Sequence, residues 1–194
     1  MSLPQSPRLV RAFDYACLLH ATQKRKGTEV PYISHLMGVA AIALEHGASE
    51  DEAIAALLHD AAEDAGGAPV IEEIRARFGG AVADIVAGCS DTFELPKPAW
   101  RERKEAYIRH LEGASRSVLL VSAADKLHNV RSLTSDYRAV GEALWARFTG
   151  GREGTLWYYR ALADAFLRIH RTRLSEELYL ATREFATLAE GLGV

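Results

Sequence analysis

Residues 55–65 read AALLHDAAEDA, a run of small and apolar residues that also holds four ionisable side chains. Apolar residues recur here at three- and four-residue steps, and this spacing, typical of amphipathic helices, continues through almost the whole chain. No alternating stretch bounded by turn residues indicates a strand. The sequence therefore predicts an all-α protein, folded as a bundle of helices.

The ionisable residues of this run are His59, Asp60, Glu63 and Asp64. If one continuous helix carries them, residues four apart share a side, and the three carboxylates crowd together on two turns. A divalent cation would offset their repulsion, because imidazole and carboxylate groups are ordinary ligands of zinc, manganese and iron. The alternative is a hydrogen-bonded core histidine beside a solvated acidic face, which a lone His-Asp pair would favour.

Two distant residues support the metal interpretation. Asp125 follows the apolar run VLLVSAA, where a buried carboxylate is costly unless it is paired or bound to a metal. His35 stands just after the Pro31-Tyr32 turn. The order His, His-Asp, Asp on three helical segments can supply four ligands to one ion and still leave positions open for water and substrate.

Capping residues, glycines and prolines divide the chain into expected helices. Ser49 and Glu52 have the spacing of a capping box. The expected helices run from about Pro7 to Lys24, from Ser34, from Ser49 through His59-Asp60 to Gly66-Gly67, from Pro69 to Gly79-Gly80, from there to Ser90, from Arg101 to Glu112 and from Ser117 to Leu133, with two more after Gly150-Gly151.

The chain has 194 residues, of which 48% are hydrophobic and 25% charged. This length and composition suit one soluble globular domain, and no linker or repeat divides it. We therefore expect a single domain over residues 1–194, with a motif-bearing core at about 8–135 and C-terminal helices at 137–194.

A formal net charge of −3 provides no global basic field, so we expect no nucleic-acid or membrane partner. The two cysteines, Cys17 and Cys89, lie in apolar helical stretches without a CxxC pattern and are expected to be buried thiols. No apolar run is long enough to span a bilayer, and the start lacks a secretory signal. A cytoplasmic location fits these features best.

Three segments together resemble a known family. QKRKGTEVPYISH (23–35), ALLHDAAEDAGG (56–67) and SAADKLHNVRSL (122–133) are similar to the successive motifs of the HD superfamily, and in particular to its alarmone hydrolase branch. That branch comprises the hydrolase domain of Rel/Spo proteins and the small stand-alone alarmone hydrolases. The resemblance implies one divalent metal ion, with manganese favoured and zinc, iron, cobalt or nickel as alternatives, on His35, His59, Asp60 and Asp125.

The same resemblance implies hydrolysis of the 3′-pyrophosphate of guanosine tetra- or pentaphosphate (ppGpp or pppGpp). Glu63 and Asp64 match the acidic pair that positions or activates the attacking water. Such a role is chemically sound, because a metal lowers the pKa of bound water and a nearby carboxylate accepts the proton.

Five residues are candidates for substrate binding by this resemblance. Arg25 and Lys26 match a basic pair that meets the nucleotide, and Asn129 shares a helix face with Asp125; Lys97 and Arg131 are weaker candidates. The alternatives are an ordinary solvated turn for Arg25-Lys26 and a local capping role for Asn129.

Other functions stay open on the sequence. The metal and the hydrolysis can be right while the substrate is another nucleotide or a phosphorylated metabolite. A non-catalytic nucleotide-sensing helical module and a purely structural helical protein are the alternatives from other classes. A small-molecule nucleotide is the expected partner, and a homo-oligomer is left open.

Overall fold

The computed structural model describes residues 6–90 and 98–191, so the predicted substrate residue Lys97 lies outside the described part of the chain. Within those ranges the chain forms ten α-helices and two 3₁₀ segments, and its one β-type contact is an isolated bridge between Lys24 and Pro31. The predicted all-helical fold is confirmed.

The α-helices are α1 (Pro7–Leu19), α2 (Ile33–Glu45), α3 (Glu50–Leu58), α4 (Ala61–Ala65), α5 (Ala68–Phe78), α6 (Gly80–Cys89), α7 (Trp100–His110), α8 (Arg116–Val140), α9 (Gly151–Ile169) and α10 (Arg173–Ala189). The 3₁₀ segments are η1 (Leu111–Gly113) and η2 (Gly141–Arg147). The predicted capping box of Ser49 and Glu52 is present at the start of α3.

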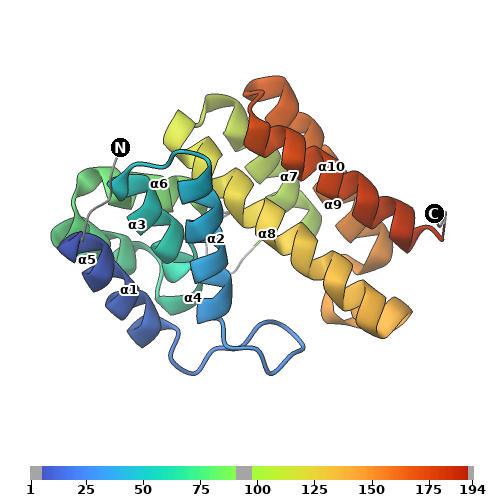
Figure 1. Cartoon of the computed structure of the whole chain (residues 1–194), viewed down its shortest axis with the longest axis horizontal. Coiled ribbons are helices and arrows are strands. Elements are labelled where there is room, and N and C mark those ends of the chain that lie inside the picture. The colour runs from blue at the N-terminus through green and yellow to red at the C-terminus, as the bar shows by residue number, and fades with distance from the viewer. Residues whose placement is uncertain (1–5, 91–97, 192–194) are drawn as a thin grey trace.

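Helix α8, with 25 residues, is the axis of the molecule. It runs diagonally across the view in Figure 1, with α1, α3 and α5 on one side and α9 and α10 on the other. It packs against α2, α3 and α6 on the first side and against α9 and α10 on the second. A residue on α8 can therefore meet residues from both parts of the bundle.

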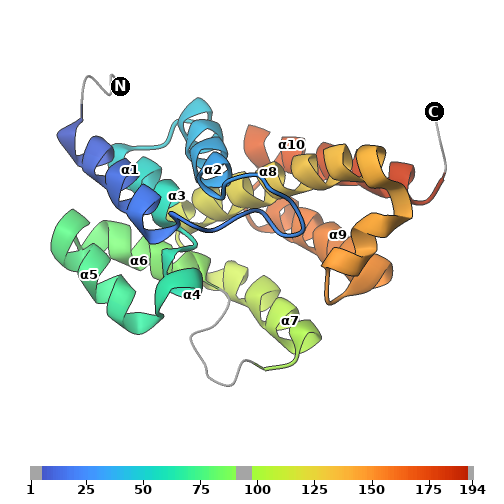
Figure 2. The ribbon, with the colours of Figure 1, turned by 90° about the horizontal axis from the view of Figure 1, so that it is seen from below.

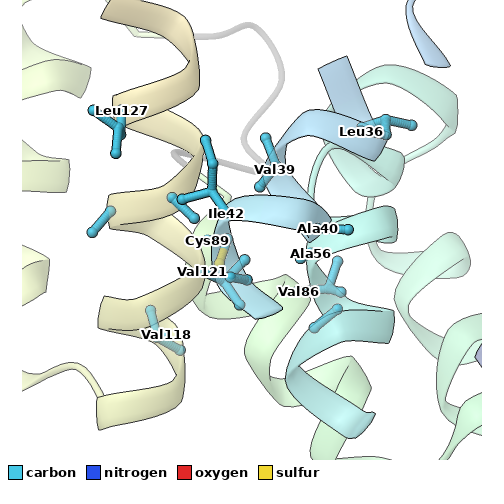
Figure 3. Packing of buried hydrophobic residues seen from close by; sticks show 14 of the residues in the cluster. Leu36, Val39, Ala40, Ile42, Ala56, Val86, Cys89, Val118, Val121 and Leu127 are labelled. Atoms are coloured by element: carbon cyan, nitrogen blue, oxygen red, sulfur yellow. The ribbon is translucent and has the colours of Figure 1, made fainter. Parts of the chain in front are cut away.

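The core that fixes these helices is apolar and continuous. Figure 3 shows side chains of α2, α3, α6 and α8 converging on one another. Burying each large side chain contributes roughly 1.5–3 kcal/mol. This packing fixes the positions of α2 and α8, which carry His35 and Asp125, and of α3, which leads into His59 and Asp60. The labelled residues are Leu36, Val39, Ala40, Ile42, Ala56, Val86, Cys89, Val118, Val121 and Leu127.

The first helix is shorter than expected: it ends at Leu19, not at Lys24. The chain then forms a narrow loop in which the Tyr32 amide donates to the Gln23 carbonyl (2.9 Å) and the Arg25 amide to the Val30 carbonyl (2.8 Å). These bonds across the loop replace the helical ones. The loop reaches over toward α8 (Figure 2), which brings Arg25 to the candidate site.

Both cysteines are free thiols, with Cys89 buried, as expected, and Cys17 only half-buried. Burial raises the pKa of the Cys89 thiol to about 11, so this thiol stays protonated. Among the described residues, no helix combines the length and apolar character needed to cross a membrane.

Candidate metal centre and active site

His59 and Asp60 lie at a break between two helices. Helix α3 ends at Leu58 and α4 begins at Ala61, so the continuous helix expected through His59-Asp60 is wrong. The Nδ1 atom of His59 lies 2.8 Å from the Ala56 carbonyl oxygen. A carbonyl only accepts, so Nδ1 carries a proton, and Nε2 is the ring atom that faces Asp60 and can bind a metal once it is deprotonated.

The break separates the roles of the acidic residues. Asp60 turns toward the loop, where its Oδ2 accepts a hydrogen bond from the Tyr32 hydroxyl at 2.5 Å. Asp64 is exposed, and its Oδ2 accepts from the Gln23 side-chain amide at 2.8 Å. Glu63 is half-buried and lines a cavity described below. Asp60 and Asp64 are nevertheless one helical turn apart, because the Asp64 amide donates to the Asp60 carbonyl at 3.1 Å, and both carboxylates contact the loop.

Three helical segments bring the predicted ligands together. His35 lies in the first turn of α2, and Asp125 lies on α8. The Nε2 atom of His35 is 3.2 Å from Oδ1 of Asp125 and 3.5 Å from Oδ2 of Asp60. The Nε2 atom of His59 is 3.1 Å from Oδ2 of Asp60 and 3.6 Å from Oδ1 of Asp125.

The donor atoms fit a divalent cation. The buried Nε2 atoms of His35 and His59 have no hydrogen-bond partner, because their approaches to the carboxylates lack hydrogen-bond alignment. Buried polar atoms are normally satisfied, so an unsatisfied pair is unusual. One ligand atom from each of His35, His59 and Asp125 lies within 4.8 Å of the others. Two imidazoles and a carboxylate are a common ligand set for such ions.

The charges of the cluster stabilise one another. Burial opposes ionisation of Asp60, but the adjacent His59 holds the pKa of that carboxyl well below its ordinary value. Burial likewise opposes the charged form of His59, but Asp60 and Asp125 hold its pKa well above 6.5. In the metal-free protein Nε2 of His59 therefore also carries a proton, and a metal must displace that proton to bind.

Lys126 neutralises the outer side of Asp125. Its ammonium group lies 2.5 Å from Oδ2 of that residue, and 15% of the Lys126 side chain is exposed. Burial would raise the pKa of Asp125, but Lys126 and the two histidines hold it well below its ordinary value. One carboxylate oxygen is thus paired with lysine, and the other faces the histidines.

His128 lies directly behind His35, with its Nδ1 atom 2.9 Å from the Nδ1 atom of His35. Burial lowers the pKa of His128 to about 4, with the neighbouring His35 as the next cause. The ring of His128 is packed against the ring of His35, a predicted ligand.

Two adjoining cavities are lined by residues that contact the predicted ligands, namely Tyr32 and Asn129 in the first and Lys126 and Asn129 in the second. The first, which we call the Arg25 cavity, has about 270 Å³. The second, the Glu63 cavity, has about 330 Å³. Both are lined by Lys26, Asn129, Phe148 and Tyr159. The Arg25 cavity adds Arg25, Thr28, Val30, Tyr32, Ser34, His128, Ser132, Leu133 and Asp136, and the Glu63 cavity adds Glu63, Trp100, Arg103, Lys104, Lys126, Thr149, Thr155 and Tyr158.

The structure brings most of the predicted substrate residues to these cavities. The Arg25 guanidinium donates to Oδ1 of Asn129 at 2.7 Å, and the Asn129 amide nitrogen donates to Oδ1 of Asp125. The exposed Lys26 lies over the Phe148 ring, 5.7 Å from its centroid. Arg131 is the exception, because its exposed guanidinium pairs with Glu177 at 3.2 Å and lines neither cavity.

Sequence reasoning missed the roles of three neighbours of the candidate centre, Tyr32, Lys126 and His128. Tyr32 and Lys126 stand beside predicted ligands in the motifs, but their partners depend on the folded chain. His128 carried no signal that distinguished it from a surface histidine. In the aromatic run LWYY at residues 156–159, Tyr159 lines both cavities. Trp157 instead packs under the Arg101 guanidinium.

The comparison with known families agrees with this geometry. A family model described as HD domain matches residues 12–156. The chain belongs to this family. The match spans all three motifs, and the resemblance drawn from them is confirmed.

Several relatives of this HD-domain protein are named guanosine-3′,5′-bis(diphosphate) 3′-pyrophosphohydrolase MESH1. MESH1 of Xenopus tropicalis is 41% identical over 126 residues, which are 64% of this chain and 69% of that protein. Human MESH1 is 33% identical over 178 residues, 87% of this chain and 96% of that protein. The resemblance to the alarmone hydrolase branch is therefore confirmed as well.

A solved structure is similar over the whole chain. It is described as a metazoan orthologue of SpoT that hydrolyses ppGpp, and it aligns with a TM-score of 0.77 at 25% identity. The alignment covers 99% of this chain and 100% of the other. The C-terminal helices α9 and α10, which no sequence motif explained, are thus part of a shared fold.

Proposed function

We propose that this HD-domain protein is a metal-dependent 3′-pyrophosphohydrolase of ppGpp and pppGpp. The observation that carries the proposal is the buried pair of unsatisfied Nε2 atoms on His35 and His59, facing Asp60 and Asp125. The names of the relatives support the substrate. The cationic residues that line the two adjoining cavities support an anionic ligand.

The proposed metal ligands are His35, His59, Asp60 and Asp125. A divalent ion on these four residues would lower the pKa of bound water and neutralise phosphate oxygens. Asp60 belongs to the set because its Oδ2 approaches both histidine Nε2 atoms. The Tyr32 hydroxyl holds that carboxylate in place.

The reaction needs a water molecule at the phosphorus bonded to the ribose 3′ oxygen. The bond between that phosphorus and the 3′ oxygen breaks, pyrophosphate leaves, and the 3′ oxygen gains a proton. Glu63, which lines a cavity beside Lys126, is the proposed acceptor of the proton from the water. Asp64, oriented by Gln23, is its proposed partner in positioning that water.

The cationic residues provide substrate binding in this account. Arg25 and Lys26 neutralise phosphate charge, with Asn129 holding the Arg25 guanidinium beside the centre. Such fixed charges suit phosphoryl transfer, which depends mainly on positioning and electrostatic stabilisation. Lys97 keeps its proposed role from the motif resemblance, whereas the position of Arg131 gives no support to a substrate contact.

The identity of the metal, the compartment, the domain organisation and the oligomeric state are proposed from the sequence. Manganese is the favoured ion, with zinc, iron, cobalt and nickel as alternatives, and the cytoplasm is the favoured compartment. We propose that residues 1–194 form a single domain, with a homo-oligomer as the alternative to a monomer.

The substrate is tested with a panel of nucleotides and phosphorylated metabolites, each incubated with the purified protein and manganese. We expect ppGpp and pppGpp to be consumed faster than the other compounds. Faster turnover of another nucleotide would support the alternative phosphohydrolase, and tight nucleotide binding without turnover under any metal would support a sensing module.

A further inference from the structure

The two imidazoles of His35 and His128 meet through the same type of atom. Their Nδ1 atoms lie 2.9 Å apart, a hydrogen-bond distance, and their ring centroids lie 4.8 Å apart. A hydrogen bond between two ring nitrogens needs a proton on one and a lone pair on the other. The pair therefore shares one proton, and its position decides the tautomer of His35.

Only one position of that proton suits a metal at His35. The Nε2 atom of His35 faces Asp60 and Asp125, so a metal there needs the lone pair of Nε2. The proton of His35 must then lie on Nδ1, where it is donated to Nδ1 of His128. His128 consequently carries its own proton on Nε2.

Gly38 provides the space for this arrangement. A Cβ atom at residue 38 would lie 2.3 Å from both Cδ2 and Nε2 of the His128 ring. Because no side chain can approach that closely, any larger residue at position 38 would displace the ring of His128. Gly38 lies one turn after His35 on α2. The same helix therefore carries the ligand His35 and the glycine that leaves space for the His128 ring.

We propose that His128 is a positioning residue, which accepts the Nδ1 proton of His35 and so presents the Nε2 lone pair of His35 to the metal. Outer hydrogen-bond partners of this kind fix the orientation and basicity of histidine ligands. The inference rests on the metal site of the proposed function. Its tests measure metal binding without nucleotide, so they give an answer whether or not ppGpp is the substrate.

The first test uses the unaltered protein, labelled with ¹⁵N and loaded with zinc. Long-range ¹H–¹⁵N correlation spectra report which ring nitrogen of each histidine carries a proton. We expect His35 to be protonated on Nδ1 and zinc-bound through Nε2, and His128 to be protonated on Nε2. A proton on Nδ1 of His128 would overturn the proposal, as would a failure of zinc to bind.

The second test compares manganese affinities by electron paramagnetic resonance. His128→Phe keeps an aromatic ring but removes the acceptor, so we expect manganese binding to weaken by roughly ten- to a hundredfold. His128→Asn places an amide oxygen at a similar distance from the backbone and is expected to restore most of the affinity. Wild-type affinity in His128→Phe would contradict the proposal.

A glycine pair provides a matched control. Gly38→Ala should displace His128 and weaken manganese binding in the same direction as His128→Phe. Gly113→Ala should leave the affinity unchanged, because a Cβ atom at residue 113 meets nothing within 4 Å. Equal affinities for these two variants would contradict the proposal, even if His128→Phe failed to fold.

Discussion

The ammonium nitrogen of Lys126 lies 2.5 Å from Oδ2 of Asp125, whereas Oδ1 of the same carboxylate faces His35 and His59. Lysine therefore neutralises one side of the buried carboxylate and leaves the other side for a cation. Breaking such a buried pair is costly because one charge remains without a partner.

Replacing Lys126 by methionine should destabilise the metal-free protein by about 3 kcal/mol, because Asp125 loses its cationic neighbour. Urea unfolding in the presence of a chelator measures this change. Lys126→Arg is the control and should retain most of the stability. Manganese should recover part of the loss in Lys126→Met, and equal stability of Lys126→Met and wild type would contradict this role of Lys126.

The stability of the metal-free protein should depend on pH in a defined direction. The pKa of His59 is raised above 6.5, so its stabilising charge is fully present below pH 6.5 and is lost as pH rises through the folded-state pKa. The pKa values of Asp60 and Asp125 are lowered. Their contribution to stability is therefore fully present above pH 3.8 and is lost as pH falls through the folded-state pKa values.

Thermal unfolding in chelator should therefore show greatest stability between about pH 4 and about pH 6.5, with a decline on the alkaline side. Saturating manganese should remove that decline, because the metal takes the place of the His59 proton. A His59→Gln variant should lack the alkaline decline in chelator. An unfolding midpoint that rises with pH above pH 6.5 in metal-free wild type would contradict this role of the His59 charge.

Neutralising the proposed catalytic acids should separate chemistry from metal binding. Glu63→Gln and Asp64→Asn should each lower kcat by about 10²–10⁴-fold, the usual range for a lost general acid or base. Manganese affinity should stay near the wild-type value, because neither residue is a proposed ligand. Glu72→Gln, an exposed glutamate on α5, is the control. Loss of manganese binding in Glu63→Gln would instead place Glu63 among the ligands.

The two arginines of the motifs should behave differently. Arg25→Ala should raise the KM for ppGpp by about tenfold or more, since a charge-assisted contact contributes about 1.5–3 kcal/mol. Arg131→Ala should change KM little, because its guanidinium pairs with Glu177 away from both cavities. Steady-state kinetics at one fixed salt concentration compares them, and an equal rise in KM for both variants would rule out this assignment of Arg25.

Local patterns in the sequence were sufficient for much of the fold. The capping box at Ser49 and the helix ends near Gly66 and Gly79 follow from short-range rules, and they are present in the structure. The loop after Leu19 was missed, because its hydrogen bonds join residues such as Gln23 and Tyr32 whose pairing no helical period reveals.

The candidate ligands were also recognisable, since a histidine or carboxylate in an apolar run is costly to bury unless it is paired or bound to a metal. The break at His59-Asp60 was not recognisable from the sequence. There the Ala56 carbonyl accepts a hydrogen bond from the His59 side chain, whereas the sequence predicted His59 within a regular helix. The partners of His128 and Lys126 depend on how α2 and α8 pack together. Such contacts between helices have no local signature.

The most direct test of the central claim is ³¹P NMR analysis of the products from ppGpp and manganese. We expect wild type to form guanosine 5′-diphosphate and pyrophosphate in equal amounts, and an Asp60→Ala variant to form neither. Pyrophosphate release no greater than that of Asp60→Ala, from a protein shown to bind manganese, would contradict the account.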